Sequence, residues 1–265
     1  MSGDGPGGLI EAVVVTGGGA GIGRASALAA AERGAKVAVL DLDEGGAKDT
    51  ARLAGDRGAP IAIGLGCDVR DEDSVSRAIG ASGDEVGAIT GLVACAGIFR
   101  GGLVHELPLE RWHDVLATNL TGTYLTCKHV LGHMLEHGKG GSIVCTSSPV
   151  ADAAVPGGAS AYCASKGGIS ALVKSLAVDY APRSIRVNAI VPGATETALM
   201  WADMPTEEIP AAREKVNGQL PLGRLGQPDE IAEGIIWLLS DHASYVTGSQ
   251  FVVDGGLMAR ASIDS

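Results

Sequence analysis

Tyr162 and Lys166 are four residues apart, and their side chains are suited to acid–base chemistry. Residues at this spacing lie on one face of a helix, so the ammonium group of Lys166 would stand beside the phenol of Tyr162. A neighbouring positive charge stabilises a phenolate and could lower the tyrosine pKa from its usual value of about 10 toward neutrality. The spacing predicts that Tyr162 exchanges a proton with a substrate, whereas on an exposed helix face it would carry no chemistry.

A glycine-rich turn lies near the start of the chain, between an apolar strand-like run and a helical pattern. Gly17, Gly21 and Gly23 follow the spacing TGxxxGxG, with Ile22 before the last glycine. Glycines in such a turn let the backbone approach a pyrophosphate closely at a helix N-terminus. An ordinary tight turn has a similar composition, but the strand-to-helix context favours a dinucleotide site.

An acidic residue follows the glycines by about 20 residues, as in many dinucleotide-binding folds. This residue, Asp41, ends the second expected strand and precedes Leu42. A carboxylate at this place accepts hydrogen bonds from the adenosine ribose hydroxyls and would repel a 2′-phosphate. A helix N-cap or a solvated strand end is the alternative, but the position relative to the glycines favours the ribose.

These features occur in one order along the chain and resemble the classical short-chain dehydrogenase/reductase family. Ser147 and Ser148 follow a strand-like run between the glycine turn and the tyrosine. The resemblance extends from Val13 to Gly256. It includes the further segments Cys67-Asp68-Val69, Asn119-Leu120-Thr121-Gly122, Val187-Asn188-Ala189, Pro192-Gly193 and Val252-Val253-Asp254-Gly255-Gly256.

The resemblance implies a role for each matching residue. Ser148 would bind and polarise the substrate oxygen, Tyr162 would exchange its proton, and Lys166 would bind the nicotinamide ribose while lowering the tyrosine pKa. Asn119 would support a water that leads to Lys166. Contacts with the NAD cofactor would come from Gly17, Gly21, Ile22, Gly23, Asp41, Leu42, Asp68, Val69, Ala96, Gly97, Tyr162, Lys166, Pro192, Gly193, Thr195 and Thr197.

The chain departs from the family pattern at two places. The usual Asn-Asn-Ala-Gly run reads Ala94-Cys95-Ala96-Gly97 here. The segment from the serine to the tyrosine is one residue longer than is usual. The second departure leaves Ser147 as an alternative to Ser148 for the catalytic serine.

The elements that must position these residues alternate between apolar strand-like runs and helical patterns. This alternation predicts an α/β fold, a single Rossmann-type domain over residues 1–265 with a doubly wound, seven-stranded parallel sheet covered by helices on both faces. The expected strands are Ala12–Thr16, Lys36–Leu40 ending at Asp41, Ile61–Leu65, Leu92–Cys95, Ser142–Thr146, Ile185–Val191 and Gln250–Val253. The expected helices run from Ile22 to Gly34, Glu72 to Ile79, Leu109 to Glu136 with a bend near Asn119, Ala159 to Tyr180 and Pro228 to Leu239. Residues 1–9 are expected to be flexible, and the irregular segment 194–219 is expected to be a substrate lid.

Composition and charge exclude several classes of partner. The net charge of −11 argues against nucleic acid, which requires clustered basic residues, and no segment is long and apolar enough to span a membrane. Five scattered cysteines without CxxC spacing are typical of reduced thiols in a cytoplasmic protein. His129, His133 and His137 share a helix face, but no accompanying carboxylates or cysteines predict a metal site.

The sequence therefore predicts an NAD-dependent oxidoreductase that interconverts a secondary alcohol and a ketone. Its partner would be a small, partly apolar alcohol or ketone, and the family resemblance implies a homotetramer. One alternative is a 3-ketoacyl-thioester reductase, which would usually prefer NADPH and need a basic surface for a carrier. The other is a non-catalytic NAD-binding sensor, against which the intact Ser148, Tyr162, Lys166 and Asn119 argue.

Overall fold

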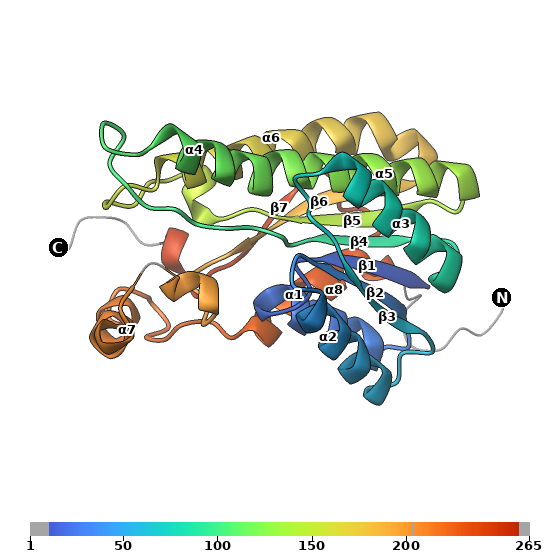
Figure 1. Cartoon of the computed structure of the whole chain (residues 1–265), viewed down its shortest axis with the longest axis horizontal. Helices are drawn as coiled ribbons and strands as arrows, with labels where there is room; N and C mark the ends of the chain where they lie inside the picture. Colours follow the sequence, from blue (N-terminus) through green and yellow to red (C-terminus); the bar gives the residue numbers. More distant parts are fainter. Residues whose placement is uncertain (1–10, 203, 260–265) are drawn as a thin grey trace.

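A seven-stranded parallel sheet forms the centre of the structure, a computed structural model that describes residues 11–202 and 204–259 (Figure 1). The strand order is β3-β2-β1-β4-β5-β6-β7, so the chain crosses from one edge back to the middle between β3 and β4. This confirms the expected doubly wound sheet and places a topological switch point between β1 and β4, where such folds bind ligands. The strands are β1 (Ala12–Thr16), β2 (Lys36–Asp41), β3 (Ala62–Gly66), β4 (Gly91–Ala94), β5 (Gly141–Thr146), β6 (Ile185–Pro192) and β7 (Gln250–Val253).

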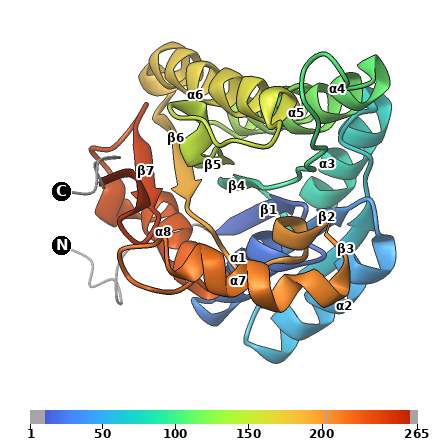
Figure 2. The same cartoon turned by 90° about the vertical axis from the view of Figure 1, so that its left-hand side faces the viewer.

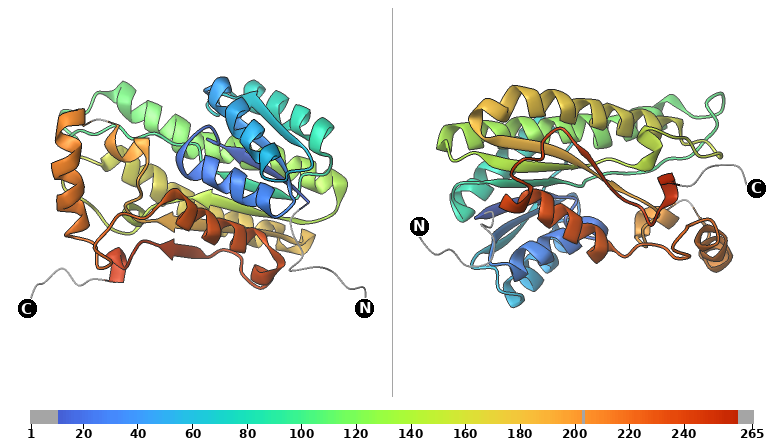
Figure 3. Two further views of the ribbon diagram at one scale, coloured as in Figure 1. Left: turned by 90° about the horizontal axis from the view of Figure 1, so that it is seen from below. Right: turned by 180° about the vertical axis from the view of Figure 1, so that it is seen from behind.

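Helices cover both faces of the sheet, as Figures 1 and 3 show. One face packs against α3 (Glu72–Val86), α5 (Gly122–His137) and α6 (Ser160–Tyr180). The other face packs against α1 (Gly21–Glu32), α2 (Glu44–Asp56) and α8 (Pro228–Leu239). Because both faces are covered, the central strands are buried at nearly every position, which explains their continuous apolar runs.

Helix α2 is absent from the sequence-based expectation, which left the segment after Asp41 without an element. The helix carries the sequence EGGAKDTARLAGD and buries only small side chains, Ala47, Thr50, Ala51 and Ala54. Its two early glycines and its charged residues obscure the helical period. The close fit also depends on Gly64 of β3, where an added Cβ would lie 2.5 Å from the Ala47 carbonyl.

The expected helix Leu109–Glu136 is interrupted near Asn119, where the sequence predicted a bend. The chain forms α4 (Leu109–Val115), then a π-helical segment at Leu116–Thr121, and then α5. A π-helical turn widens the backbone locally and is frequent at functional sites. Here it carries Asn119 into the interior, where that side chain is fully buried.

The segment 194–219 is more regular than its composition indicates. It contains short 3₁₀ turns at Ala198–Trp201 and Thr206–Glu208, followed by α7 (Ile209–Asn217), which lies apart from the sheet across one end of the molecule (Figure 2). A parallel bridge joins Thr195, near the start of this segment, to Gly226, seven residues after its end. Residues 1–9, for which flexibility was expected, lie outside the described residues. No helix in the described ranges is long and apolar enough to cross a membrane.

Candidate functional site

A cavity of about 1180 Å³ lies at the carboxyl ends of the strands. Small-molecule sites commonly measure about 300–1,000 Å³, so the cavity has room for a dinucleotide and a small substrate together. Except for Asn119, every residue that the sequence assigns to catalysis or cofactor binding lines this cavity, as does the alternative serine Ser147. The fold therefore brings together motifs that lie far apart along the chain.

The glycine turn after β1 is packed so closely that larger residues would clash. A Cβ added at Gly17 would lie 2.7 Å from Ala96 Cα, and one added at Gly23 would lie 2.1 Å from the Gly17 carbonyl oxygen. Helix α1 begins at Gly21, and its N-cap residue Ala20 offers no side chain to the first free N–H groups. Backbone N–H groups of this uncapped helix start lie at the cavity wall and fit the pyrophosphate of a dinucleotide.

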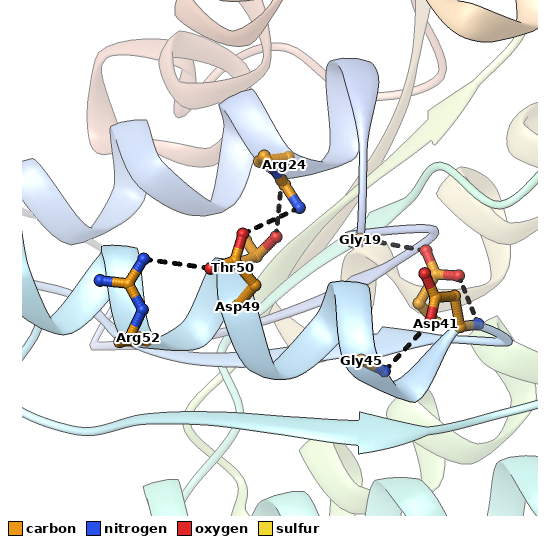
Figure 4. Close-up of polar contacts among 8 residues, drawn as sticks. Gly19, Arg24, Asp41, Gly45, Asp49, Thr50 and Arg52 are labelled. Atoms are coloured by element: carbon orange, nitrogen blue, oxygen red, sulfur yellow. Dashed lines mark hydrogen bonds and ion pairs between the residues drawn. The ribbon is translucent and has the colours of Figure 1, made fainter.

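Asp41 is held beside the glycine turn by the backbone (Figure 4). Its Oδ2 accepts a hydrogen bond of 2.8 Å from Gly19 N–H, and its Oδ1 accepts one of 2.9 Å from Asp43 N–H. Arg24 instead turns toward α2, where Nε donates to Thr50 Oγ1 at 2.9 Å and Nη2 lies 3.4 Å from Asp49. The carboxylate of Asp41 thus lines the cavity without a cation paired to it among the described residues.

Arg70, to which the sequence assigned no role, also lines the cavity. Its Nη2 lies 2.7 Å from Asp68 Oδ2, and its Nε donates to Asp68 Oδ1 at 2.9 Å. This pairing lowers the pKa of the Asp68 carboxyl. The charge of Arg70 is therefore balanced by Asp68, two residues earlier in the chain. The sequence Asp68-Val69-Arg70 was the signal that could have indicated this ion pair.

The two candidate serines after β5 point in different directions. Ser147 is buried, and its hydroxyl donates to the Lys166 carbonyl at 3.2 Å and contacts Ser170 Oγ at 2.9 Å. Ser148 is half-buried, lines the cavity and forms a side-chain hydrogen bond with Tyr162. This geometry favours Ser148 as the residue that meets a substrate oxygen.

Burial controls the ionisation of the tyrosine and the lysine. It raises the pKa of Tyr162 to about 12, against a smaller lowering by the Ser148 hydrogen bond. It lowers the pKa of Lys166 to about 8. The Lys166 Nζ donates to the Thr146 carbonyl at 2.7 Å and lies 5.4 Å from the centre of the Tyr162 ring. The expectation of a tyrosine pKa near neutrality is therefore wrong for the protein alone, because burial outweighs the distant ammonium group.

We expect this high pKa to be visible in a tyrosinate absorbance titration without cofactor. Since a raised pKa keeps a phenol protonated, wild type and Tyr162→Phe should gain the same tyrosinate absorbance up to pH 11. Their curves should separate only above that pH. A separation below pH 9 would show that Lys166 lowers the pKa of Tyr162 after all.

Asn119 lies behind the cavity wall, next to Gly97. Its Oδ1 accepts from Ile98 N–H at 2.8 Å, and its Nδ2 donates to the Ile98 carbonyl at 3.0 Å and to Ser165 Oγ at 3.1 Å. A Cβ added at Gly97 would lie 3.4 Å from Asn119 Oδ1 and 3.8 Å from Lys166 Nζ. Asn119 therefore fixes the loop under the cavity, and its role in holding a water stays a prediction.

Glu196 joins the start of the segment 194–219 to α7 through contacts that sequence reasoning missed. Its carboxylate accepts hydrogen bonds from Trp201 Nε1 at 2.9 Å and from Arg213 Nε and Nη2 at 2.9 and 2.7 Å. The Arg213 guanidinium also lies 5.7 Å from the centre of the Trp201 ring. Because Glu196 stands between Thr195 and Thr197, this cluster ties α7 to the proposed nicotinamide end of the site.

We expect Glu196→Gln to raise the KM for substrate about fivefold, because a two-bonded arginine pair near the surface contributes about 1 kcal/mol. The fold should persist, since Arg213 and Glu196 remain partly exposed. Glu207→Gln, at an exposed position of the same segment, serves as the control. Steady-state kinetics check this prediction, and equal KM values for the two variants would contradict it.

The remaining histidines and cysteines show other arrangements. His129 Nε2 lies 3.3 Å from Glu72, and the rings of His133 and His137 stack with centres 4.2 Å apart. In residues 11–202 and 204–259, no three metal-binding side chains gather at one point. Cys95 lines the cavity, but burial raises the pKa of its thiol, which disfavours the reactive thiolate.

Comparisons with known proteins agree over nearly the whole chain. A family model described as enoyl-(acyl carrier protein) reductase matches residues 17–258. The chain is 43% identical over 250 residues to 2-(S)-hydroxypropyl-CoM dehydrogenase 3 of Xanthobacter autotrophicus, which covers 94% of this chain and 97% of that relative. It is 42% identical to cis-4-hydroxycyclohexanecarboxylate dehydrogenase of Sinomonas cyclohexanicum, over 93% of this chain and 96% of that relative.

A solved structure has a similar fold along nearly its whole length. The crystal structure of levodione reductase matches with a TM-score of 0.89 and 33% sequence identity. The match covers 95% of this chain and 98% of that one. The similarity therefore extends over nearly the whole of both chains.

Proposed function

Since the chain belongs to the classical short-chain dehydrogenase/reductase family, we propose that it is an NAD-dependent oxidoreductase that interconverts a secondary alcohol and a ketone. The observation that carries the proposal is the meeting of Ser148, Tyr162 and Lys166 in one cavity with the glycine turn and Asp41. The first group handles protons at a substrate oxygen, and the second fits a dinucleotide.

In the proposed mechanism, Tyr162 transfers the proton and Ser148 orients the substrate oxygen. For reduction of a ketone, the protonated Tyr162 donates its proton to the developing alkoxide. For oxidation, the Tyr162 oxygen accepts the proton from the alcohol. When bound, a nicotinamide would supply or accept the hydride, and the positive charge of its oxidised ring would favour the phenolate form of Tyr162. Lys166, held by the Thr146 carbonyl, supplies a second positive charge nearby.

Preference for NAD over NADP rests on the unpaired carboxylate of Asp41. The Gly19 and Asp43 N–H groups hold this carboxylate at the cavity wall, where it can accept from ribose hydroxyls. A 2′-phosphate there would lose those bonds and meet a like charge, each costing about 1 kcal/mol or more. Arg24 is engaged with Thr50 and Asp49, so it is not free to neutralise the phosphate.

We expect kcat/KM to be at least about tenfold higher with NAD⁺ than with NADP⁺, since about 1.4 kcal/mol corresponds to one decade. Asp41→Ala should narrow this ratio by weakening NAD⁺ binding and relieving the repulsion. Asp43→Ala, at an exposed neighbouring carboxylate, should keep the preference. Equal kcat/KM values for the two cofactors in the wild type would show that Asp41 does not face the ribose.

Relatives support a secondary alcohol as the substrate. The two described above are named for oxidation of hydroxypropyl-CoM and of cis-4-hydroxycyclohexanecarboxylate. Leu199 and Met200 give this cavity an apolar wall near the lid, which suits a partly apolar alcohol. We further propose a cytoplasmic homotetramer, as the family resemblance implies, and light scattering would test the assembly.

The proposed function is tested by a screen of secondary alcohols with NAD⁺, in which turnover is measured as the absorbance of the reduced cofactor. Turnover of at least one alcohol is expected, and it should disappear in Tyr162→Phe. Turnover of 3-ketoacyl thioesters alone, with NADPH, would favour the thioester reductase instead. The matching family model is described as enoyl-(acyl carrier protein) reductase, but the net charge of −11 disfavours docking of an acidic carrier protein.

A further inference from the structure

Arg100 lies in the loop between β4 and α4, at the end of the cavity where Tyr162 stands. Contacts on both sides of Arg100 fix this loop. The Phe99 ring meets the Tyr162 ring edge-on, with centres 5.6 Å apart and an angle of 73° between the rings. Gly102 N–H donates to the Gly158 carbonyl at 2.9 Å, just before α6. Arg100 is therefore placed on the substrate side of the cavity, away from Asp41.

Within residues 11–202 and 204–259, the charge of Arg100 has no partner of opposite sign. Its Nη1 donates to the Phe99 carbonyl at 3.0 Å, and no carboxylate among the described residues lies within ion-pair distance. The cavity's other arginine, Arg70, is paired with Asp68, and Arg213 in the lid is paired with Glu196. A guanidinium has five N–H donors, so most of those of the half-buried Arg100 remain available to a ligand.

Apolar side chains make up much of the lining of the cavity. They include Phe99, the neighbour of Arg100, as well as Val150 and Val155 from the segment before α6 and Leu199 and Met200 from the segment after β6. Asp114 and Asp152 also line the cavity, but both are exposed and neither forms an ion pair with another described residue. A charge beside apolar walls attracts an opposite charge more strongly than it would in water.

We propose that Arg100 binds a carboxylate of the substrate, so that the substrates of this site are hydroxy acids and their keto acids. The inference rests on the proposed function, because it names the substrate class of that same site. A planar guanidinium matches a carboxylate through two parallel hydrogen bonds. The carboxylate takes no part in hydride or proton transfer, but it places the alcohol carbon opposite Tyr162.

The experiment compares acids with neutral molecules of the same shape. Oxidation of 3-hydroxybutyrate and of 3-hydroxycyclohexanecarboxylate is measured beside that of their carboxamides, with wild type, Arg100→Met and Arg100→Lys. Arg77→Met, at an exposed position on α3, is the matched control. Calorimetry with butyrate, cyclohexanecarboxylate and their amides, in the presence of cofactor, measures binding without turnover.

We expect wild type to prefer the acid over the amide at least tenfold in kcat/KM or in binding. Arg100→Met should reduce this ratio at least tenfold, Arg100→Lys should give an intermediate ratio, and Arg77→Met should leave it unchanged. The proposal would be overturned if the wild type had equal kcat/KM values and equal affinities for acid and amide. An acid-to-amide ratio in Arg100→Met that equals that of the wild type would also overturn it. Acid-selective binding without turnover of any alcohol would support the anion site while contradicting the proposed function.

Discussion

Tyr162→Phe is expected to lower kcat for alcohol oxidation by about a thousandfold, within the 10²–10⁴ range of general acid–base catalysis. The substitution removes the hydroxyl that exchanges the proton and that bonds to Ser148. The remaining ring keeps its edge-on packing against Phe99. Affinity for NADH, measured by fluorescence titration, should therefore change less than threefold.

Tyr180→Phe is a suitable control, because Tyr180 ends the same helix α6 at a distance from the cavity. Its activity should stay close to that of the wild type. Activity of Tyr162→Phe within tenfold of the wild type would remove Tyr162 from the proton transfer.

The second large effect is expected from the two adjacent serines, which the structure separates by orientation. Ser148→Ala should lower kcat about a hundredfold, because the substrate oxygen loses the hydroxyl that orients it. Ser147→Ala should keep kcat within about threefold and instead lower the free energy of unfolding by about 1–2 kcal/mol. That loss reflects its buried contacts with the Lys166 carbonyl and Ser170. Kinetics and denaturant unfolding of both variants check this prediction, and the reverse assignment would make Ser147 the catalytic serine.

Much of the fold is predictable because buried parallel strands give continuous apolar runs. All seven strands occur within about a residue of the expected positions, in the expected order between the motifs. The helical pattern from Leu109 to Glu136 also indicated an irregularity near Asn119, where the structure has a π-helical segment. Helix α2 is not predictable, because its contact surface consists of small residues that sequence periodicity does not distinguish from a loop.

The composition of the site is more predictable than its energetics. The motifs place the right residue types in one cavity, but the pKa of Tyr162 depends on burial and on the 5.4 Å distance from its ring centre to the Lys166 Nζ. Neither quantity is written in a four-residue spacing. The link from Glu196 to Arg213 depends on a partner 17 residues away in the sequence. The charge of Arg100 is unpaired because the fold brings no described carboxylate to it. Neither can be derived from a short motif.

The most direct test of the central claim follows the hydride itself. A secondary alcohol with deuterium on its carbinol carbon is incubated with the protein and NAD⁺, and the reduced cofactor is analysed by mass spectrometry. We predict that the reduced nicotinamide carries the deuterium and that the alcohol becomes a ketone in equal amount. Formation of reduced cofactor without deuterium, or no reduced cofactor with any alcohol tested, would contradict the account.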